Sequence, residues 1–312
     1  MTRRGALRAA LVATFGHPGW WVLSLAAFLI RGGILVILLP IVVPPTVAGL
    51  MSSLAPTIVG AVLIGGPNTP VGIVAFALAL VGLAFVAIAG TLGAWFEGAL
   101  VDSTLADAAL DDPDAVEDPG PSPRGLGTAR LLPHVASAVV FVVAAKQIFD
   151  VAYTEATDPI APSTPFLVRV LDQVPGQVLA LVAVWLLAEA IGGLALREHL
   201  LEDGAGFERP LTAIGRAIRD LLRPRSILTL LVTDLGLLVI AIPGWLAAGR
   251  AWVELQALFA DGSSFADLLT SELLFVAMLL GWLVLLGIGL AWRSVAATLL
   301  VADRRDRHAD VS

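Results

Sequence analysis

Residues 271–302 read SELLFVAMLLGWLVLLGIGLAWRSVAATLLVA. Between Glu272 and Arg293 this stretch holds twenty consecutive residues without a charge. Twenty helical residues span about 30 Å at about 1.5 Å per residue, which matches the hydrocarbon thickness of a bilayer. The stretch therefore predicts a membrane-spanning α-helix, and it places the chain among integral membrane proteins.

Apolar segments of similar length recur along the chain. Of the 312 residues, 58% are hydrophobic and 14% are charged, whereas charged residues make up about a quarter of a soluble domain. Six strong segments stand out, at residues 20–43, 71–101, 131–151, 176–196, 226–248 and 271–302. We therefore predict an all-α, polytopic membrane protein in which residues 1–312 form a single transmembrane domain with six transmembrane helices.

A seventh apolar segment, residues 46–65, is weaker than the other six. It contains Ser52, Ser53 and Pro56, and prolines flank it on both sides. Its length would still allow one crossing of the bilayer. Hydropathy alone therefore leaves six or seven crossings open.

The arginines favour six crossings, because Arg and Lys near the ends of spans are retained in the cytoplasm. Six crossings with both termini in the cytoplasm leave only Arg169 and Arg250 on the outer side. The cytoplasmic arginines are then Arg3, Arg4, Arg8, Arg124, Arg130, Arg197, Arg209, Arg216, Arg219, Arg223, Arg225, Arg304, Arg305 and Arg307. Seven crossings would move whole clusters to the wrong face. We therefore interpret residues 46–65 as a re-entrant or interfacial segment of a protein in the cytoplasmic (inner) membrane.

The most polar part of the chain is the acidic, proline-rich stretch at residues 102–130. It contains Asp111, Asp112 and Asp114 around Pro113, and it has too little apolar content to form a core. We predict a flexible cytoplasmic loop here. The formal net charge of −7 comes mostly from this loop, so it does not indicate a nucleic-acid partner.

Three of the predicted spans begin in the same way, with a short basic amphipathic stretch, a proline and then the apolar run. The stretches at residues 7–17, 128–132 and 211–223 precede Pro18, Pro133 and Pro224. Proline is tolerated at the start of a helix because the amide there has no intrahelical partner. We predict three hairpins, each introduced by an in-plane amphipathic helix on the cytoplasmic surface.

This layout, with glycine-rich spans and small-residue stretches after Trp95 and Glu189, resembles the six-helix membrane region found beside glycerophosphodiester phosphodiesterase domains. It also resembles stand-alone bacterial membrane proteins of similar layout. The resemblance covers nearly the whole chain and implies a six-helix membrane domain. It carries no catalytic residue over, because no phosphodiesterase domain is present in the sequence.

Five ionisable residues inside the predicted spans are candidates for a ligand-binding or proton-coupling site: Arg31, Glu97, Glu189, Asp234 and Arg293. A charge in hydrocarbon is costly unless it has a partner or water. In the predicted orientation four of them lie one to two turns inside the cytoplasmic boundary, and Arg31 lies deeper. We predict one shared polar cluster in which carboxylates pair with arginines. Glu189 or Asp234 is the predicted partner of Arg31.

This polar cluster has two interpretations. Its ion pairs can fix the register of packed helices, which is a purely structural role. Alternatively, the charges bind a substrate or a proton in a vestibule open to the cytoplasm. Nearby glycines, such as Gly32, Gly93 and Gly192, would allow close helix contacts in either case.

Signatures of soluble-type active sites are missing from the sequence. There is no Walker loop, no dinucleotide glycine fingerprint, no Gly-x-Ser-x-Gly elbow and no His-Glu-x-x-His pair, and the lack of cysteine excludes thiolate metal sites. His199 and Asp203 are spaced to share a helix face, which a solvated juxtamembrane helix explains. We predict no catalytic residue, no metal and no cofactor, and whether the chain is an enzyme stays open.

For function, we expect a transporter-like or lipid-handling protein that binds a small anionic or amphipathic molecule at the polar cluster. The alternative is a non-transporting scaffold or accessory subunit whose cytoplasmic arginines bind lipid or a partner protein. An intramembrane enzyme has the least support, because no nucleophile and base occur together. The expected partners are the bilayer, anionic lipid headgroups at the cytoplasmic arginines and a small-molecule ligand.

Overall fold

The computed structural model describes residues 3–38, 70–109, 125–157, 166–201, 209–262 and 264–309. These residues are helical almost throughout, and no strand occurs among them. This confirms the all-α class for the described part of the chain. The predicted re-entrant or interfacial segment at residues 46–65 lies outside the described residues, as do residues 110–124 of the predicted acidic loop.

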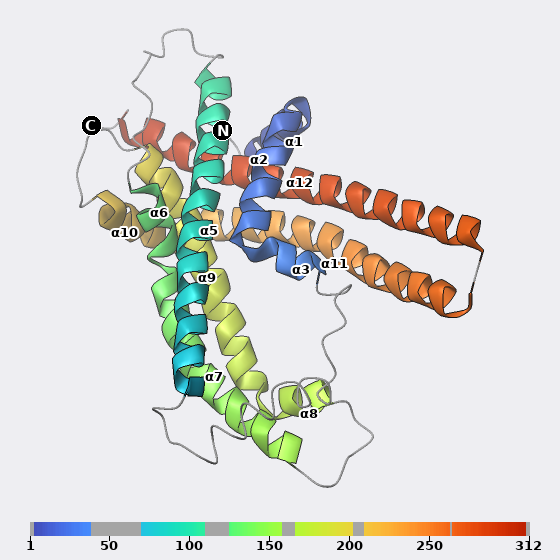
Figure 1. Ribbon diagram of the computed structural model, residues 1–312. Helices are drawn as coiled ribbons and strands as arrows, with labels where there is room; N and C mark the ends of the chain where they lie inside the picture. The colour runs from blue at the N-terminus through green and yellow to red at the C-terminus, as the bar shows by residue number, and fades with distance from the viewer. Residues whose placement is uncertain are drawn as a thin grey trace. The chain divides into compact units, whose positions relative to one another are not determined.

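Most of the helices follow one another after short breaks (Figure 1). In chain order they are α1 (Arg3–Gly16), α2 (Pro18–Phe28), the π-helical turn η1 (Leu29–Gly33), α3 (Ile34–Leu38), α5 (Pro70–Ala109), α6 (Leu126–Leu131), α7 (His134–Thr157), α8 (Phe166–Gln173), α9 (Pro175–Leu200), α10 (Arg209–Leu221), α11 (Pro224–Ala260) and α12 (Phe265–Ala309).

Five helical stretches of the described residues are long and apolar enough to cross a membrane: Pro18–Leu38, Leu80–Ala108, Pro175–Leu200, Pro224–Ala260 and Phe265–Asp303. They coincide with five of the six predicted spans. The remaining predicted span, residues 131–151, falls in α7, of which the stretch His134–Ala144 counts as a shorter apolar helix. A multi-pass membrane protein is therefore compatible with the structure, whereas six spans in three hairpins stay a prediction.

Several helices extend beyond the apolar segments that predicted them. Helix α5 continues to Ala109, and α6 begins at Leu126, so both ends of the predicted loop at residues 102–130 are helical. Thr104 is 3% exposed and Ala129 is fully buried. Packing thus orders residues that their polarity alone assigned to a loop.

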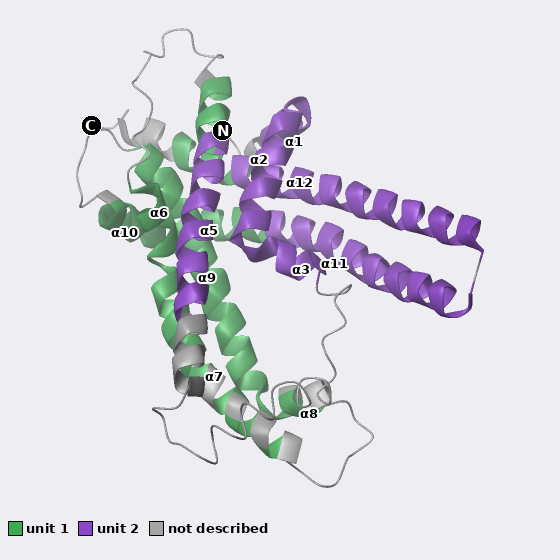
Figure 2. Cartoon of the chain, in the orientation of Figure 1, with its two compact units in different colours: residues 1–7, 101–231, 296–312 green, residues 8–100, 232–295 purple. Residues whose placement is uncertain are grey.

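The chain divides into two compact units (Figure 2). Unit 1 comprises residues 1–7, 101–231 and 296–312, and unit 2 comprises residues 8–100 and 232–295. The division falls inside the helices α1, α5, α11 and α12.

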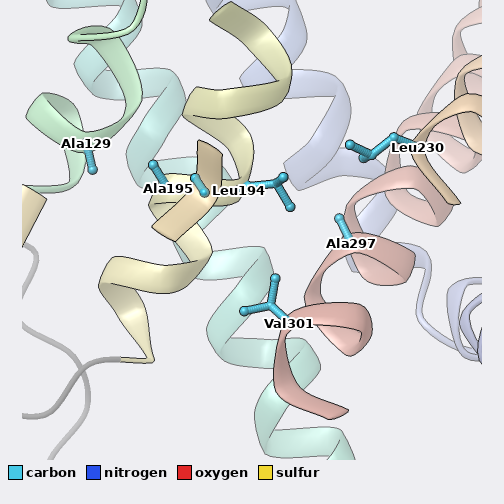
Figure 3. Packing of buried hydrophobic residues seen from close by; sticks show 7 residues of the cluster. Ala129, Leu194, Ala195, Leu230, Ala297 and Val301 are labelled. Carbon is cyan, nitrogen blue, oxygen red and sulfur yellow. The ribbon is translucent and has the colours of Figure 1, made fainter. Parts of the chain in front are cut away.

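Helix α9 is the centre of unit 1, where it contacts α6, α7, α8 and α10. Residues 192–200 at its carboxyl end are all buried. The core cluster around this end consists mainly of small residues (Figure 3): Ala129, Leu194, Ala195, Ala217, Leu230, Ala297 and Val301. Small side chains let helix backbones approach closely, which is how membrane helices gain packing energy in the absence of a hydrophobic driving force.

Unit 2 has a core of larger side chains, in which Trp282 and Leu286 of α12 pack with Ile37 of α3 and Ala248 of α11. The first span is also tied to α12 by the Ser24 hydroxyl, which donates to the Gly287 carbonyl at 3.0 Å. A serine–carbonyl bond of this kind satisfies a polar group away from water. These contacts hold residues 18–38 against α12 within unit 2.

Candidate functional site

The first stretch that is long and apolar enough to cross a membrane, Pro18–Leu38, is broken in its middle. Helix α2 ends at Phe28, the π-helical turn η1 follows, and α3 resumes at Ile34. Gly32 has φ +101°, a conformation that only glycine adopts without strain. A Cβ on Gly33 would lie 2.4 Å from the Phe28 ring, so the Gly32-Gly33 pair is what permits this break.

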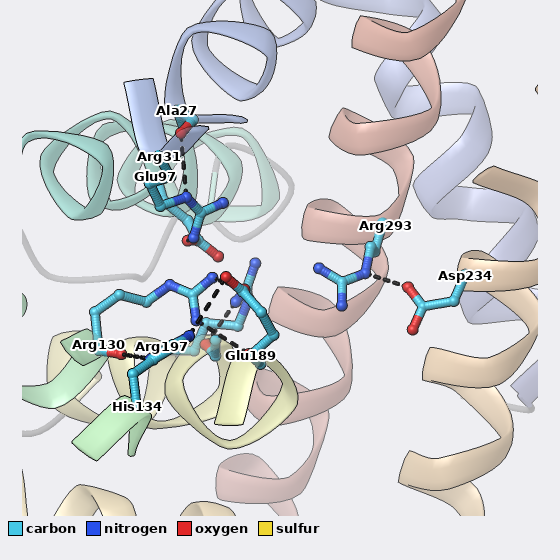
Figure 4. A network of polar contacts seen from close by, with 10 residues as sticks. Ala27, Arg31, Glu97, Arg130, His134, Glu189, Arg197, Asp234 and Arg293 are labelled. Carbon is cyan, nitrogen blue, oxygen red and sulfur yellow. Dashed lines mark hydrogen bonds and ion pairs between the residues drawn. The ribbon is translucent and has the colours of Figure 1, made fainter. Parts of the chain in front are cut away.

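Arg31 lies in this turn and forms an ion pair with Glu97 of α5 (Figure 4). Its Nη1 lies 3.1 Å from Glu97 Oε2, and its Nε donates to the Ala27 carbonyl at 3.1 Å. The Arg31 side chain is 20% exposed and that of Glu97 is 9% exposed. The break therefore holds a largely buried guanidinium between a carboxylate and a backbone carbonyl one turn back.

Gly93 makes room for this arginine. A Cβ on Gly93 would lie 2.5 Å from Arg31 Cγ and 2.8 Å from Cδ, both far inside ordinary van der Waals contact. Gly93 precedes Glu97 by four residues, so the two face the same side of α5. Helix α5 thus supplies both the groove for the arginine stem and the charge that binds its head.

Replacing Gly93 with alanine is expected to destabilise unit 2 by about 1 kcal/mol, because the Arg31 stem must shift. Gly82→Ala on the same helix is the matched control, since a Cβ there meets nothing within 4 Å. The control should be neutral or stabilising, because alanine favours a helix over glycine by up to about 1 kcal/mol. Thermal unfolding in mild detergent measures both variants; equal melting temperatures would contradict the groove assignment.

Asp234 of α11 and Arg293 of α12 form a second ion pair in unit 2 (Figure 4), in which Arg293 Nε donates to Asp234 Oδ1. The Asp234 side chain is 44% exposed. Beside it, a Cβ on Gly236 would lie 2.6 Å from the Trp292 ring. This pair therefore joins two closely packed antiparallel helices and lies nearer the surface of its unit than the Arg31–Glu97 pair.

Glu189 belongs to unit 1, where it is bound by Arg130 (Figure 4). Arg130 is 1% exposed, and it donates through Nη2 to the Glu189 carboxylate and through Nη1 to the Glu189 carbonyl at 3.0 Å. His134, one turn after Arg130, places Nε2 3.5 Å from Glu189 Oε1. Arg130 of α6 and His134 of α7 are thus assembled around one carboxylate of α9.

A further buried arginine, Arg197, lies on α9 two turns after Glu189. It is 3% exposed and donates to the Gly193 carbonyl at 2.6 Å and to Thr298 Oγ1 at 3.2 Å. In the predicted topology, Arg130 and Arg197 are ordinary cytoplasmic arginines near the ends of spans. The features that could have marked them are the i, i+4 spacing of Arg130 with His134 and of Gly193 with Arg197.

The structure brings four of the five predicted residues together as two pairs. Within unit 2, Arg31 pairs with Glu97 and Asp234 with Arg293; the carboxylate that faces Arg31 there is Glu97, whereas Glu189 and Asp234 were the predicted partners. Glu189 pairs within unit 1. One cluster shared by all five residues stays a prediction. Among the described residues there is no group of three or more His, Asp or Glu that could hold a metal ion.

Comparison of the chain with protein-family models, with curated proteins and with solved structures finds no match.

Proposed function

We propose that this chain is a transporter-like or lipid-handling membrane protein that binds a small anionic or amphipathic molecule at Arg31 and Glu97. The observation that supports this is the coincidence of the buried ion pair with the break in the first span. Non-helical backbone at membrane depth is tolerated only where protein covers it or where it lines a cavity. Interrupted helices and intramembrane charges are also what substrate sites of transporters are built from.

The Arg31–Glu97 pair is chemically suited to exchange its carboxylate for a ligand anion. A guanidinium presents two parallel N–H groups that match a carboxylate or a phosphate. Glu97 occupies that fork in the structure, where its Oε2 accepts from Arg31 Nη1 at 3.1 Å. A ligand anion would compete with Glu97 for Arg31, and protonation of Glu97 would remove the competitor. Anion binding would therefore be coupled to proton uptake.

Glu189, Asp234 and Arg293 are assigned supporting roles in this proposal. The Asp234–Arg293 pair fixes α11 against α12, and Arg130 holds Glu189 on α9. Each of these pairs balances its own charge, so it does not compete for the ligand anion. Arg31 and Glu97 are thus the two residues whose substitution should change ligand binding directly.

The test is the thermal stability of the detergent-purified chain with inorganic phosphate, citrate or lysophosphatidylglycerol. A ligand that binds only the folded state stabilises it by about 2.7 kcal/mol at about a hundred times its Kd. We expect one of these probes to raise the melting temperature of the wild type, Arg31→Lys to weaken the effect and Arg31→Ala to abolish it. Glu97→Gln should tighten binding, because it removes the competing charge.

Arg250→Ala is the matched control, since it removes one positive charge from the same unit at a side chain that is 84% exposed. Its ligand-induced shift should equal that of the wild type. A shift that survives in Arg31→Ala would overturn the assignment of the site.

The second candidate is a scaffold or accessory subunit, and the completeness of the pairing favours it. Each of the five predicted residues has an opposite charge within its own unit, as expected of pairs that only fix helix register. If no probe stabilises the wild type, while Arg31→Ala melts at a lower temperature than Arg250→Ala, the scaffold function is the better explanation.

A further inference from the structure

Helix α10 has one face packed against the other helices of unit 1. Ala213 and Ala217 are fully buried, and Asp220 is 5% exposed. Ile214 and Leu221 pack against the core cluster that contains Leu194 and Ala195 of α9. This face accounts for part of the amphipathic pattern of the helix.

A second apolar stripe runs along the exposed side of α10. Leu211 and Ile218 of α10 are 56% and 43% exposed, and Leu222, the first residue after the helix, is 75% exposed. The Leu222 N–H still donates to the Ile218 carbonyl at 3.2 Å, so the spacing of seven and four residues aligns the three side chains. The single apolar stripe predicted from the sequence thus divides into two. One stripe packs on the core of unit 1, and the other is exposed. Three neighbouring leucine and isoleucine side chains facing water would be unfavourable.

Three arginines, Arg216, Arg219 and Arg223, are exposed along one edge of this outer stripe. Arg223 Nη1 also lies 3.6 Å from Asp220 Oδ1. On a helical wheel the arginines lie between the outer stripe and the buried face. This pattern, with apolar side chains beside basic ones, suits the boundary of a bilayer, where apolar acyl chains lie below a layer of anionic headgroups.

The chain itself brings α10 to such a surface. Only Leu222 and Arg223 separate the end of α10 from Pro224, which begins the apolar helix α11. The three steps from Leu221 to Pro224 span at most about 11 Å. The carboxyl end of the exposed stripe, at Leu222, therefore lies close to the start of a helix that is long and apolar enough to cross a membrane.

We propose that the outer face of α10 is a binding surface for anionic phospholipid. Leu211, Ile218 and Leu222 insert at the level of the upper acyl chains, and the three arginines bind lipid phosphates. Juxtamembrane arginines each strengthen the attraction towards an anionic surface by about fivefold, on the order of 1 kcal/mol apiece. This surface is separate from the Arg31–Glu97 site and does not depend on what that site binds.

The same arrangement occurs before the first span. In α1, Ala10 and Thr14 are buried, whereas Val12 and Phe15 are 65% and 56% exposed beside the exposed Arg8. Pro18 then begins α2, with only His17 between it and the end of α1 at Gly16. Two helices in different parts of the sequence thus combine a protein-facing side with an exposed apolar side next to a span.

The test uses the full chain, which contains no cysteine, so single cysteines can be labelled. Ile218→Cys and Leu222→Cys carry a bimane fluorophore, and Ser264→Cys in the exposed turn before α12 is the control. The proteins are reconstituted in vesicles of phosphatidylcholine and phosphatidylglycerol. One of the two lipids is brominated near the top of its acyl chains, and iodide serves as the quencher from water.

We expect brominated lipid to quench the labels at residues 218 and 222 at least about twofold more than the label at residue 264, and iodide to show the reverse order. Brominated phosphatidylglycerol should quench more, mole for mole, than brominated phosphatidylcholine. Replacing Arg216, Arg219 and Arg223 together with glutamine should remove this preference while the chain stays monodisperse.

Three results would overturn the proposal. Iodide quenching at residue 218 equal to that at residue 264 would place the face in water. Protection from both quenchers would mean that protein covers it, as in a complex with a second copy. A preference for phosphatidylglycerol that persists after the arginine substitutions would show that these arginines do not recognise the lipid phosphate.

Discussion

Replacing Arg130 with methionine is expected to lower the free energy of unfolding by about 3–5 kcal/mol, the usual cost of removing one partner of a buried ion pair. Arg130 is 1% exposed and donates to both the carboxylate and the carbonyl of Glu189. Methionine keeps most of the aliphatic volume of the arginine side chain. The loss of unfolding free energy therefore measures the contribution of the guanidinium group. The midpoint of thermal or denaturant unfolding in mild detergent measures it.

A double-mutant cycle with Glu189→Gln separates the pair from other effects of the substitution. If the two charges stabilise each other, the double variant should be more stable than the sum of the single losses predicts, by about 0.5–3 kcal/mol. Arg219→Met on the exposed side of α10 is the control and should change stability by no more than about 0.5 kcal/mol. Strict additivity of the two substitutions would mean that Arg130 acts through packing alone.

The helical class and most helix starts could be predicted from the sequence, because both follow from local chemistry. Pro18 and Pro224 begin α2 and α11, as their positions before the apolar runs indicated. The helix ends could not be predicted in this way. Hydropathy detects only the part of a helix that suits lipid. Helix α11 continues to Ala260, well past residue 248, where the predicted span ends.

The site residues that lie in the middle of a span could be predicted from the sequence, because a charge in hydrocarbon is costly unless it has a partner or a function. This reasoning did not identify Arg130 and Arg197 as site residues, because an arginine near the end of a span normally extends to the headgroups. Their burial comes from contacts of α9 with α6 and α10 and with Thr298, more than a hundred residues further along the chain. Such packing has no local pattern in the sequence.

The close contact between α6 and α9 gives the second large prediction. A Cβ on Gly192 would lie 2.5 Å from the Arg130 carbonyl oxygen and 2.8 Å from its Nη1. The carbonyl is a backbone atom, so it cannot turn aside as a flexible side chain can. Gly192→Ala should therefore separate the two helices and destabilise the protein by about 1–3 kcal/mol, the cost of overpacking a core.

Gly176→Ala is the control on the same helix, because a Cβ there meets nothing within 4 Å. Alanine is the better helix former by up to about 1 kcal/mol, so this control should be neutral or raise the melting temperature. The same substitution in one helix is thus expected to have opposite signs at residues 176 and 192. If both variants are stabilised, the α6–α9 contact is looser than the structure has it. Arg130 would then owe its burial to the Glu189 carboxylate more than to the fit against Gly192.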